Sequence, residues 1–350
     1  TPITDWQAYR QRLRELMGQE TKFTQNLFET VRLHPKRVVF AEGSHPKMLQ
    51  AAVQAKEEGF CHPVLLGNEE EIKRIADELE LSLDGCELVN LRDNSESERR
   101  LRYAKILAQK REREGFNLEV ARDKMFERNY FGMMMVETGD ADAFITGLYT
   151  RYTGTIQAAK EVIGIRPGYA HFGALHLVSS KNGICFFGDT LINRDPDEHA
   201  LYDLARLAAS GVRFFNRTPA LAMISYSNFG SDEEGKPAVV HRVVERMQKE
   251  YPDLAIDGEM QVNFALDREL RDEKYPFTRL KGQDVNTLIF QSLSAANAAY
   301  KIAKSMADEG EVIGPIQIGL NKAIHFTDFE ADVRDIVNVT AIAVLDATVQ

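Results

Sequence analysis

Short apolar segments alternate with amphipathic ones along this chain, and this alternation constrains the fold more than any other feature. Residues 37–43 form an apolar run that predicts a buried strand, and residues 46–58 carry apolar side chains at helical spacing. A second apolar run at 62–67 and a second amphipathic stretch at 69–79 repeat the pattern. Because the connections are short, the pattern indicates a parallel sheet covered by helices, and we predict an α/β fold.

The pattern continues to the end of the sequence. Further strands are predicted at residues 141–147, 173–178, 184–187, 222–226, 286–290 and 316–319. Helices are predicted at residues 95–135, 154–163, 196–210, 236–250, 295–308 and 332–347. A chain of 350 residues exceeds one ordinary core, and no Pro/Ser-rich linker divides it, so we predict two domains that share or exchange chain segments.

Charge and cysteine content exclude several classes of protein. The formal net charge of −10 argues against nucleic acid and anionic membranes as partners, because both require a basic surface. The three cysteines, Cys61, Cys86 and Cys185, contain no CxxC pair, so neither a disulfide framework nor a structural zinc site is indicated. Reduced thiols fit a cytoplasmic location, and no apolar run is long enough to span a membrane.

Two strand ends carry candidate ligand-binding residues. The first, at 222–231, ends in hydroxyl and amide side chains and a glycine, with Ser227, Asn228 and Ser231 as candidate contacts. Such a turn offers N–H groups and hydroxyls to an anion, although a plain Ser/Asn/Gly turn has the same composition. The second, at 147–154, contains Tyr149 and Arg151. An arginine between aromatics can clamp a phosphate or stack on a base, and an exposed loop arginine is the equally favoured alternative.

Other titratable residues give weaker signals. Asp257 and Glu259 are two residues apart, and a solvated turn is favoured over a general base or a metal site. His171 and His176 are five residues apart, which is not the spacing of a helical metal pair. The sequence contains no GxGxxG, GxxxxGK[ST], HExxH or GxSxG motif, so a self-sufficient dinucleotide dehydrogenase is not supported.

Five segments together resemble the phosphate acetyl/butyryltransferases and occur in that family's order from about residue 20 onward. The segments are residues 38–43, 131–142, 225–231, 257–261 and 314–316. The resemblance implies two α/β/α domains with mostly parallel sheets and a cleft between them. It also implies a homodimer or a higher homo-oligomer. Active members transfer an acetyl group between CoA and phosphate without a metal.

Two further segments, 137–143 and 331–338, are similar to the phosphotransacetylase-like C-terminal portion of the hybrid NADP-dependent malic enzymes. On this resemblance, residues 1–20 are expected to be a connecting helix from upstream malic enzyme domains. Residues 21–165 plus 318–350 are expected to form the first domain and residues 166–317 the second. No cofactor is expected in this segment. NADP and a divalent metal are expected only in malic enzyme domains, and acetyl-CoA is the expected effector.

The resemblance also locates departures from the active family pattern. A Ser-Arg pair of active transferases is replaced by Asp328 and Phe329, and a second phosphate-site arginine is replaced by Gln157. Asp335 matches the aspartate that would deprotonate the CoA thiol, and Arg111 matches another site arginine. Losing one electrostatic contact to the developing charge costs about 3–4 kcal/mol, so losing two should leave little rate.

These departures lead to a hypothesis and two alternatives. The hypothesis is a regulatory unit that binds acetyl-CoA without transferring its acyl group. Its predicted ligand contacts are Arg111, Tyr149, Arg151, Ser227, Asn228, Ser231, Asn321 and Lys322. One alternative is an active phosphate acetyl/butyryltransferase with Asp335 as its base. The other is an oligomerisation scaffold with a vestigial site.

Overall fold

The computed structural model describes residues 22–149, 152–180, 183–306 and 312–349. The expected connecting helix at residues 1–20 and the candidate Arg151 therefore lie outside the described residues. The chain divides into two compact units: unit 1 comprises residues 1–166 and 320–350, and unit 2 comprises residues 167–319. Both units are α/β, as the alternating pattern predicts. Among the described residues, no helix has the length and apolar character needed to cross a membrane.

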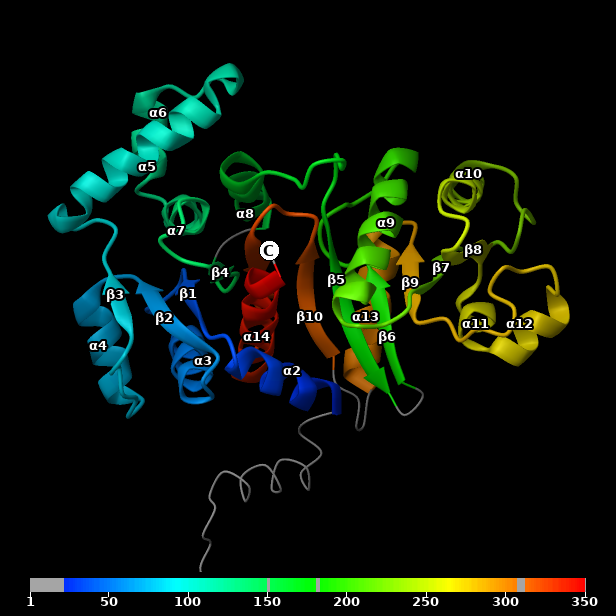
Figure 1. The fold of residues 1–350 in the computed structure, drawn as a ribbon, viewed down its shortest axis with the longest axis horizontal. Helices are drawn as coiled ribbons and strands as arrows, with labels where there is room; N and C mark the ends of the chain where they lie inside the picture. Colours follow the sequence, from blue (N-terminus) through cyan, green and yellow to red (C-terminus); the bar gives the residue numbers. More distant parts are fainter. Residues whose placement is uncertain (1–21, 150–151, 181–182, 307–311, 350) are drawn as a thin grey trace, which may run out of the picture. The chain divides into compact units, whose positions relative to one another are not determined.

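Unit 1 contains a five-stranded parallel sheet in the order β11-β4-β1-β2-β3 (Figure 1). Its strands are β1 (Lys36–Phe40), β2 (Cys61–Leu66), β3 (Glu87–Val89), β4 (Ala143–Thr146) and β11 (Ala323–Phe326). Its helices are α2 (Lys22–Arg32), α3 (Pro46–Glu57), α4 (Glu69–Glu78), η1 (Asn94–Glu96), α5 (Ser97–Lys110), η2 (Glu112–Glu114), α6 (Leu118–Lys124), α7 (Arg128–Glu137), α8 (Tyr152–Ala158), the π-helical turn η3 (Ala159–Ile163) and α14 (Val333–Val349).

The C-terminal segment completes the core of unit 1. Strand β11 pairs with β4, and α14 packs against α2, α3, β1, β4 and β11. Every residue from Ile336 to Val344 is buried, because this helix is enclosed on all sides and not on one face alone. The short strands β3 and β11 were not predicted from the sequence. Each has only three or four residues, too few for a period to stand out.

Unit 2 contains a six-stranded mixed sheet in the order β10-β5-β6-β9-β7-β8. Its strands are β5 (Gly173–Ser180), β6 (Gly183–Gly188), β7 (Ala220–Ile224), β8 (Ala255–Met260), β9 (Thr287–Phe290) and β10 (Val312–Ile318). Its helices are α9 (Glu198–Phe214), α10 (Gly235–Glu250), α11 (Val262–Leu266), α12 (Arg268–Lys274) and α13 (Leu293–Met306). Strand β5 pairs antiparallel with both β10 and β6, and the remaining pairs are parallel.

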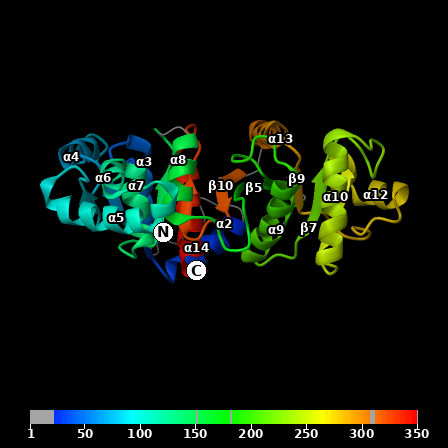
Figure 2. The same cartoon turned by 90° about the horizontal axis from the view of Figure 1, so that it is seen from above.

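Helices cover the unit 2 sheet on two sides. Figure 2 shows α9 and α13 on opposite sides of β5 and β9. Helix α10 packs beside α9 and against β8. All three cysteines are free thiols, as their spacing predicts. Burial raises the pKa of the Cys61 thiol and raises that of Cys185 to about 12, so both thiols stay protonated at neutral pH.

Close packing between α7 and β4 gives a testable consequence. A Cβ atom at Gly132 in α7 would lie 2.4 Å from a ring carbon of Phe144 in β4, whereas a Cβ atom at Gly154 in α8 would meet nothing within 4 Å. Gly132→Ala should therefore destabilise the protein by about 1–3 kcal/mol. The matched change Gly154→Ala should be neutral or stabilising by roughly 0.5–1 kcal/mol. Urea denaturation measures both, and equal stability of the two variants would contradict this packing.

Candidate functional site

The carboxyl end of the unit 1 sheet is the first candidate site, because the strand order changes direction there. The chain passes from β1 outward to β2 and β3, then crosses to β4 and β11 on the other side of β1. Ligands of open parallel sheets bind beyond the strand ends at such a switch point. The chain leaves β1 through Glu42 and leaves β4 through Gly147, so these two residues lie at the switch.

The carboxylate of Glu42 joins the two strand ends. Its Oε1 accepts hydrogen bonds from Thr146 Oγ1 at 2.8 Å and from the Gly147 N–H at 3.2 Å. The side chain is buried, and Oε2 has no hydrogen-bond partner among the described residues. Burial raises the pKa of Glu42, and the bonds from Thr146 and Gly147 oppose part of that shift. The group can accept a ligand hydrogen bond as a carboxylate, or donate one when protonated.

An aromatic side chain and a basic side chain gather beside Glu42. The ring centroid of Tyr149 lies 4.8 Å from that of His45, and the guanidinium carbon of Arg128 lies 5.3 Å from the Tyr149 centroid. The positive charge of Arg128 also acts on Glu42 and lowers its pKa against the larger effect of burial. Tyr149 is 55% exposed, so a ligand at the strand end can reach this residue.

Sequence reasoning assigned no role to Glu42 or Arg128. Glu42 is the second residue after β1, and its position directly beyond an apolar strand is the signal that could have identified it. Arg128 begins α7, in the middle of a charged region where several arginines look alike. Only the fold shows that this particular arginine reaches the switch between β1 and β4.

Arg111 and Asn321 come together at the end of η3. The Arg111 guanidinium donates to the carbonyl oxygens of Glu161 and Lys160, each at 2.5 Å, and Asn321 Nδ2 donates to those of Ile163 and Ile165 at 3.2 Å. These contacts satisfy carbonyl groups that a helix end leaves without partners. If Arg111 and Asn321 bind a ligand as predicted, they must use side-chain N–H groups that already donate to these carbonyl oxygens. Lys322 follows Asn321 as an exposed residue.

Asp335 forms a reciprocal cap at the start of α14. Its N–H donates to Asp332 Oδ1 at 2.8 Å, and its Oδ2 accepts from the Asp332 N–H at 3.3 Å. This is the geometry of a capping box, in which each of two residues at a helix N-terminus donates its backbone N–H to the side chain of the other. The carboxylate predicted as a base thus also stabilises the first turn of a buried helix.

The three positions that depart from the active family pattern lie in unit 1 and present no cation. Asp328 follows β11 by two residues, and its Oδ1 accepts from the Glu330 N–H at 3.4 Å. Phe329 is 66% exposed. The side-chain amide of Gln157 donates to Glu161 Oε1 at 2.7 Å. A carboxylate and an aromatic ring thus stand at the end of β11 where the resemblance places a serine and an arginine.

The loop after β7 in unit 2 is tied down from within. The N–H groups of residues 227–232 each donate inside the protein. The acceptors are Ser225, Ser227, Asn228, Ser231 and both the backbone and the side chain of Glu259. The sequence suggested that these N–H groups bind an anion. In the structure they are already bonded, and a buried carboxylate lies against them. The hydroxyl groups of Ser227 and Ser231 are bonded to each other at 2.9 Å, and that of Ser227 also donates to Glu259 Oε1. An anion would therefore have to displace protein bonds here, and Ser227, Asn228 and Ser231 stay predicted contacts.

The favoured interpretation of Asp257 and Glu259 as a solvated turn is wrong. Both lie in β8 and are buried, because β8 is paired with β7 and covered by α10. Asp257 accepts from Thr278 Oγ1 at 2.7 Å and from the Arg279 N–H at 2.8 Å. Glu259 Oε1 accepts from Ser227 Oγ at 2.9 Å. Both carboxylates therefore organise loops around the β8 strand.

The fold and the strand-end residues place the chain in a known class. Residues 22–344 match the model of the phosphate acetyl/butaryl transferase family, and the chain belongs to this family. A phosphotransacetylase from Streptococcus pyogenes shares the fold with a TM-score of 0.84 and 28% identity over 94% of this chain and 98% of that chain.

Relatives fall into two groups. An NADP-dependent malic enzyme from Salmonella typhimurium is 33% identical over 347 residues, which cover 99% of this chain and 46% of that protein. A phosphate acetyltransferase from Acetivibrio thermocellus is 30% identical over 332 residues, covering 93% of this chain and 98% of that protein. The chain thus corresponds to slightly less than half of the malic enzyme relatives and to nearly all of that transferase.

The buried carboxyl group of Glu42 predicts a pH-dependent effect on stability. Its pKa in the folded state is raised above 4.5, so its contribution is fully present below about pH 4.5 and is lost as the pH rises through the folded pKa. Glu42→Gln keeps the acceptor for Thr146 and Gly147 and carries no charge. The stability of this variant relative to wild type should therefore increase from about pH 4.5 to about pH 8.

Thermal denaturation across that pH range measures the difference. The exposed residue Glu29 supplies the control, because Glu29→Gln removes a carboxylate that is not buried. If the stability of Glu42→Gln changes with pH in the same way as that of Glu29→Gln, burial does not destabilise the Glu42 carboxylate.

Proposed function

We propose that this chain is an acetyl-CoA-binding regulatory unit derived from a phosphate acyltransferase, without transferase activity of its own. We propose further that it belongs to a larger NADP-dependent malic enzyme that oxidatively decarboxylates malate to pyruvate and CO2. Acyl-CoA binding would act on that activity through a homo-oligomer. Such regulation requires that acetyl-CoA bind two conformations of the protein with different affinity.

The observation that carries the proposal is the Asp328–Phe329 pair after β11. Active relatives resembled by this sequence place a serine and an arginine there. A carboxylate at this position repels phosphate, and an exposed aromatic ring cannot neutralise the charge that develops during acyl transfer. Gln157, at the second departing position, uses its amide on Glu161. The site therefore favours recognition of an acyl-CoA over reaction with phosphate.

The positive charge of Arg128 does not make reaction with phosphate more favourable than recognition of an acyl-CoA. Its guanidinium lies against the Tyr149 ring, and its charge acts on the buried Glu42 carboxylate. Arg128 can still hold a phosphate of a CoA nucleotide beside an aromatic platform, since arginine binds phosphate and stacks on rings at the same time. This is the contact that we assign to acyl-CoA in unit 1.

An active phosphate acetyl/butyryltransferase is the second candidate function. Asp335 keeps a carboxylate at the position of the family's proposed base, and Arg128 brings one guanidinium to the carboxyl end of the same sheet. If Arg128 acts on phosphate and not on CoA, the substitutions at 328 and 329 would lower the rate without abolishing it.

Calorimetry with acetyl-CoA tests the binding proposal. We expect saturable heat at micromolar to millimolar acetyl-CoA and about tenfold weaker binding for Arg128→Gln, equivalent to loss of one charge-assisted contact. The exposed Arg113 supplies the control, because Arg113→Gln makes the same charge change outside the site. Absence of heat with wild type at millimolar acetyl-CoA would favour a scaffold without ligand. Equal weakening in both variants would refute the Arg128 site.

Restoring the family pattern tests the loss of activity. With acetyl phosphate and CoA, wild type should form no measurable thioester, while Asp328→Ser/Phe329→Arg should raise the rate by about tenfold or more above background. The double change removes one negative charge and adds one positive charge, and Glu330→Arg gives the same net change of two at the neighbouring residue. Thioester formation by wild type that disappears in Asp335→Asn would instead establish the transferase. An equal gain in the restored and control variants would show that net charge and not the Ser-Arg pair limits the reaction, and no gain in either would show that these substitutions do not limit it.

A further inference from the structure

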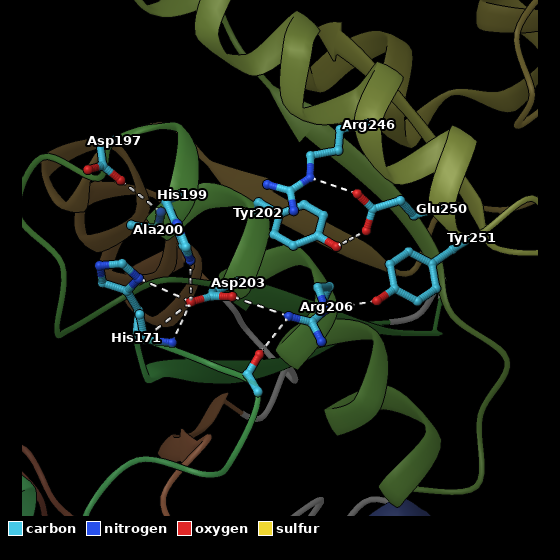
Figure 3. A network of polar contacts seen from close by, with 12 residues as sticks. His171, Asp197, His199, Ala200, Tyr202, Asp203, Arg206, Arg246, Glu250 and Tyr251 are labelled. Atoms are coloured by element: carbon cyan, nitrogen blue, oxygen red, sulfur yellow. Dashed lines mark hydrogen bonds and ion pairs between the residues drawn. The ribbon is translucent and has the colours of Figure 1, made fainter.

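Two histidines and an aspartate converge in unit 2. His171 lies just before β5, while His199 and Asp203 lie four residues apart on α9 and so share one face of that helix. His171 Nδ1 is 3.1 Å from Asp203 Oδ2, and His199 Nε2 is 3.7 Å from the same oxygen. The three ligand atoms all lie within 4.8 Å of one another, and Figure 3 shows both rings directed at the carboxylate.

We propose that His171, His199 and Asp203 form a binding site for a divalent transition metal, and specifically for Zn²⁺. Two imidazole nitrogens and one carboxylate oxygen are a ligand set that zinc accepts, with the remaining position filled by water. Calcium and magnesium prefer sites built from oxygen alone, so the two imidazoles argue against them. Zinc bonds to nitrogen and oxygen are about 2.0–2.2 Å long, and ligand atoms three to five ångströms apart can surround one ion after small side-chain rotations.

The carboxylate is held in place before any metal binds. Asp203 is 1% exposed, and its Oδ2 accepts hydrogen bonds from the N–H groups of Ala170 at 2.9 Å and His171 at 3.2 Å. These bonds fix both the carboxylate and the backbone that carries the His171 ring. Hydrogen bonds that orient a metal ligand increase metal affinity, and loss of such a bond costs about 10- to 100-fold.

Neighbouring charges leave the site open to a cation. Arg206 Nη1 lies 3.4 Å from Asp203 Oδ1, the oxygen that does not face the histidines, so its charge is directed at the other side of the carboxylate. The same guanidinium donates to the Gly168 carbonyl and to the Tyr251 hydroxyl, both at 3.0 Å. Asp197, the N-cap of α9, adds a second carboxylate whose charge interacts with both imidazoles. The surroundings of the histidine pair thus contain two carboxylates and one guanidinium, so negative charge exceeds positive charge.

The degree of exposure suits a site that metal can enter. The side chains of His171 and His199 are 30% and 61% exposed, whereas Asp203 forms the buried base. A bound ion would be held from below by the carboxylate and from the solvent side by the two rings. It would link the segment before β5 to the first turns of α9. Both elements belong to unit 2, so the site requires no partner chain and no contribution from unit 1.

Zinc titration of the metal-stripped chain tests the proposal. Wild type should bind one zinc ion per chain and gain thermal stability, since an ion that binds the folded state stabilises it by mass action. His199→Gln should weaken zinc binding by about tenfold or more and remove the stabilisation. The exposed His34 supplies the control, and His34→Gln should behave as wild type.

Cobalt provides an independent readout, because Co²⁺ in a site with these ligands gives visible absorption that depends on its coordination. The wild-type spectrum should change or disappear in His171→Gln and in His199→Gln, and persist in His34→Gln. If the two imidazoles only form hydrogen bonds with Asp203, wild type will bind no stoichiometric zinc. Either that result or equal zinc binding by His199→Gln and His34→Gln would overturn the proposal.

Discussion

The buried carboxylate of Glu42 is the interaction on which the first candidate site depends. It lies where the strand order of the unit 1 sheet reverses, and its Oε1 holds Thr146 and Gly147 beside the end of β1. Thr327 lies against the same glycine, where a Cβ atom would come within 2.3 Å of its carbonyl oxygen. One carboxyl group therefore fixes the end of β4, and the end of β11 packs against that same turn. A buried group of this kind is tolerated because Oε1 is bonded to two donors and because the raised pKa favours the neutral form of the group.

The same structural device appears in unit 2 with a different result. Glu259 is fully buried and its Oε1 accepts from Ser227 and Gly230, while its Oε2 lies 3.3 Å from Nδ1 of His241. Here the carboxylate accepts from one N–H group and one hydroxyl group that would otherwise be open to a ligand. Buried carboxyl groups thus hold the loops that follow the strands in both units.

The chain belongs to the family, and it carries Asp328 and Phe329 where the resemblance places a serine and an arginine. The framework of strands, caps and buried carboxylates is needed for stability whether or not the reaction occurs, because each buried polar group must keep its partner. Asp335 illustrates this point, since its carboxylate caps α14 through Asp332. Retention of a residue that would be catalytic in a relative is therefore weak support for catalysis here.

The sequence by itself determined the α/β class, most strands and helices, and the family, because apolar periodicity and local strings depend on near neighbours along the chain. It missed β3 and β11, which are too short to show a period. It also missed β8, because the polar residues Asp257 and Glu259 suggested a solvated turn although both are buried in that strand. Only the tertiary structure placed Arg128 beside Tyr149 and Glu42, and paired His171 with His199 and not with His176. Those contacts join residues far apart in sequence, and strand order and helix packing decide them.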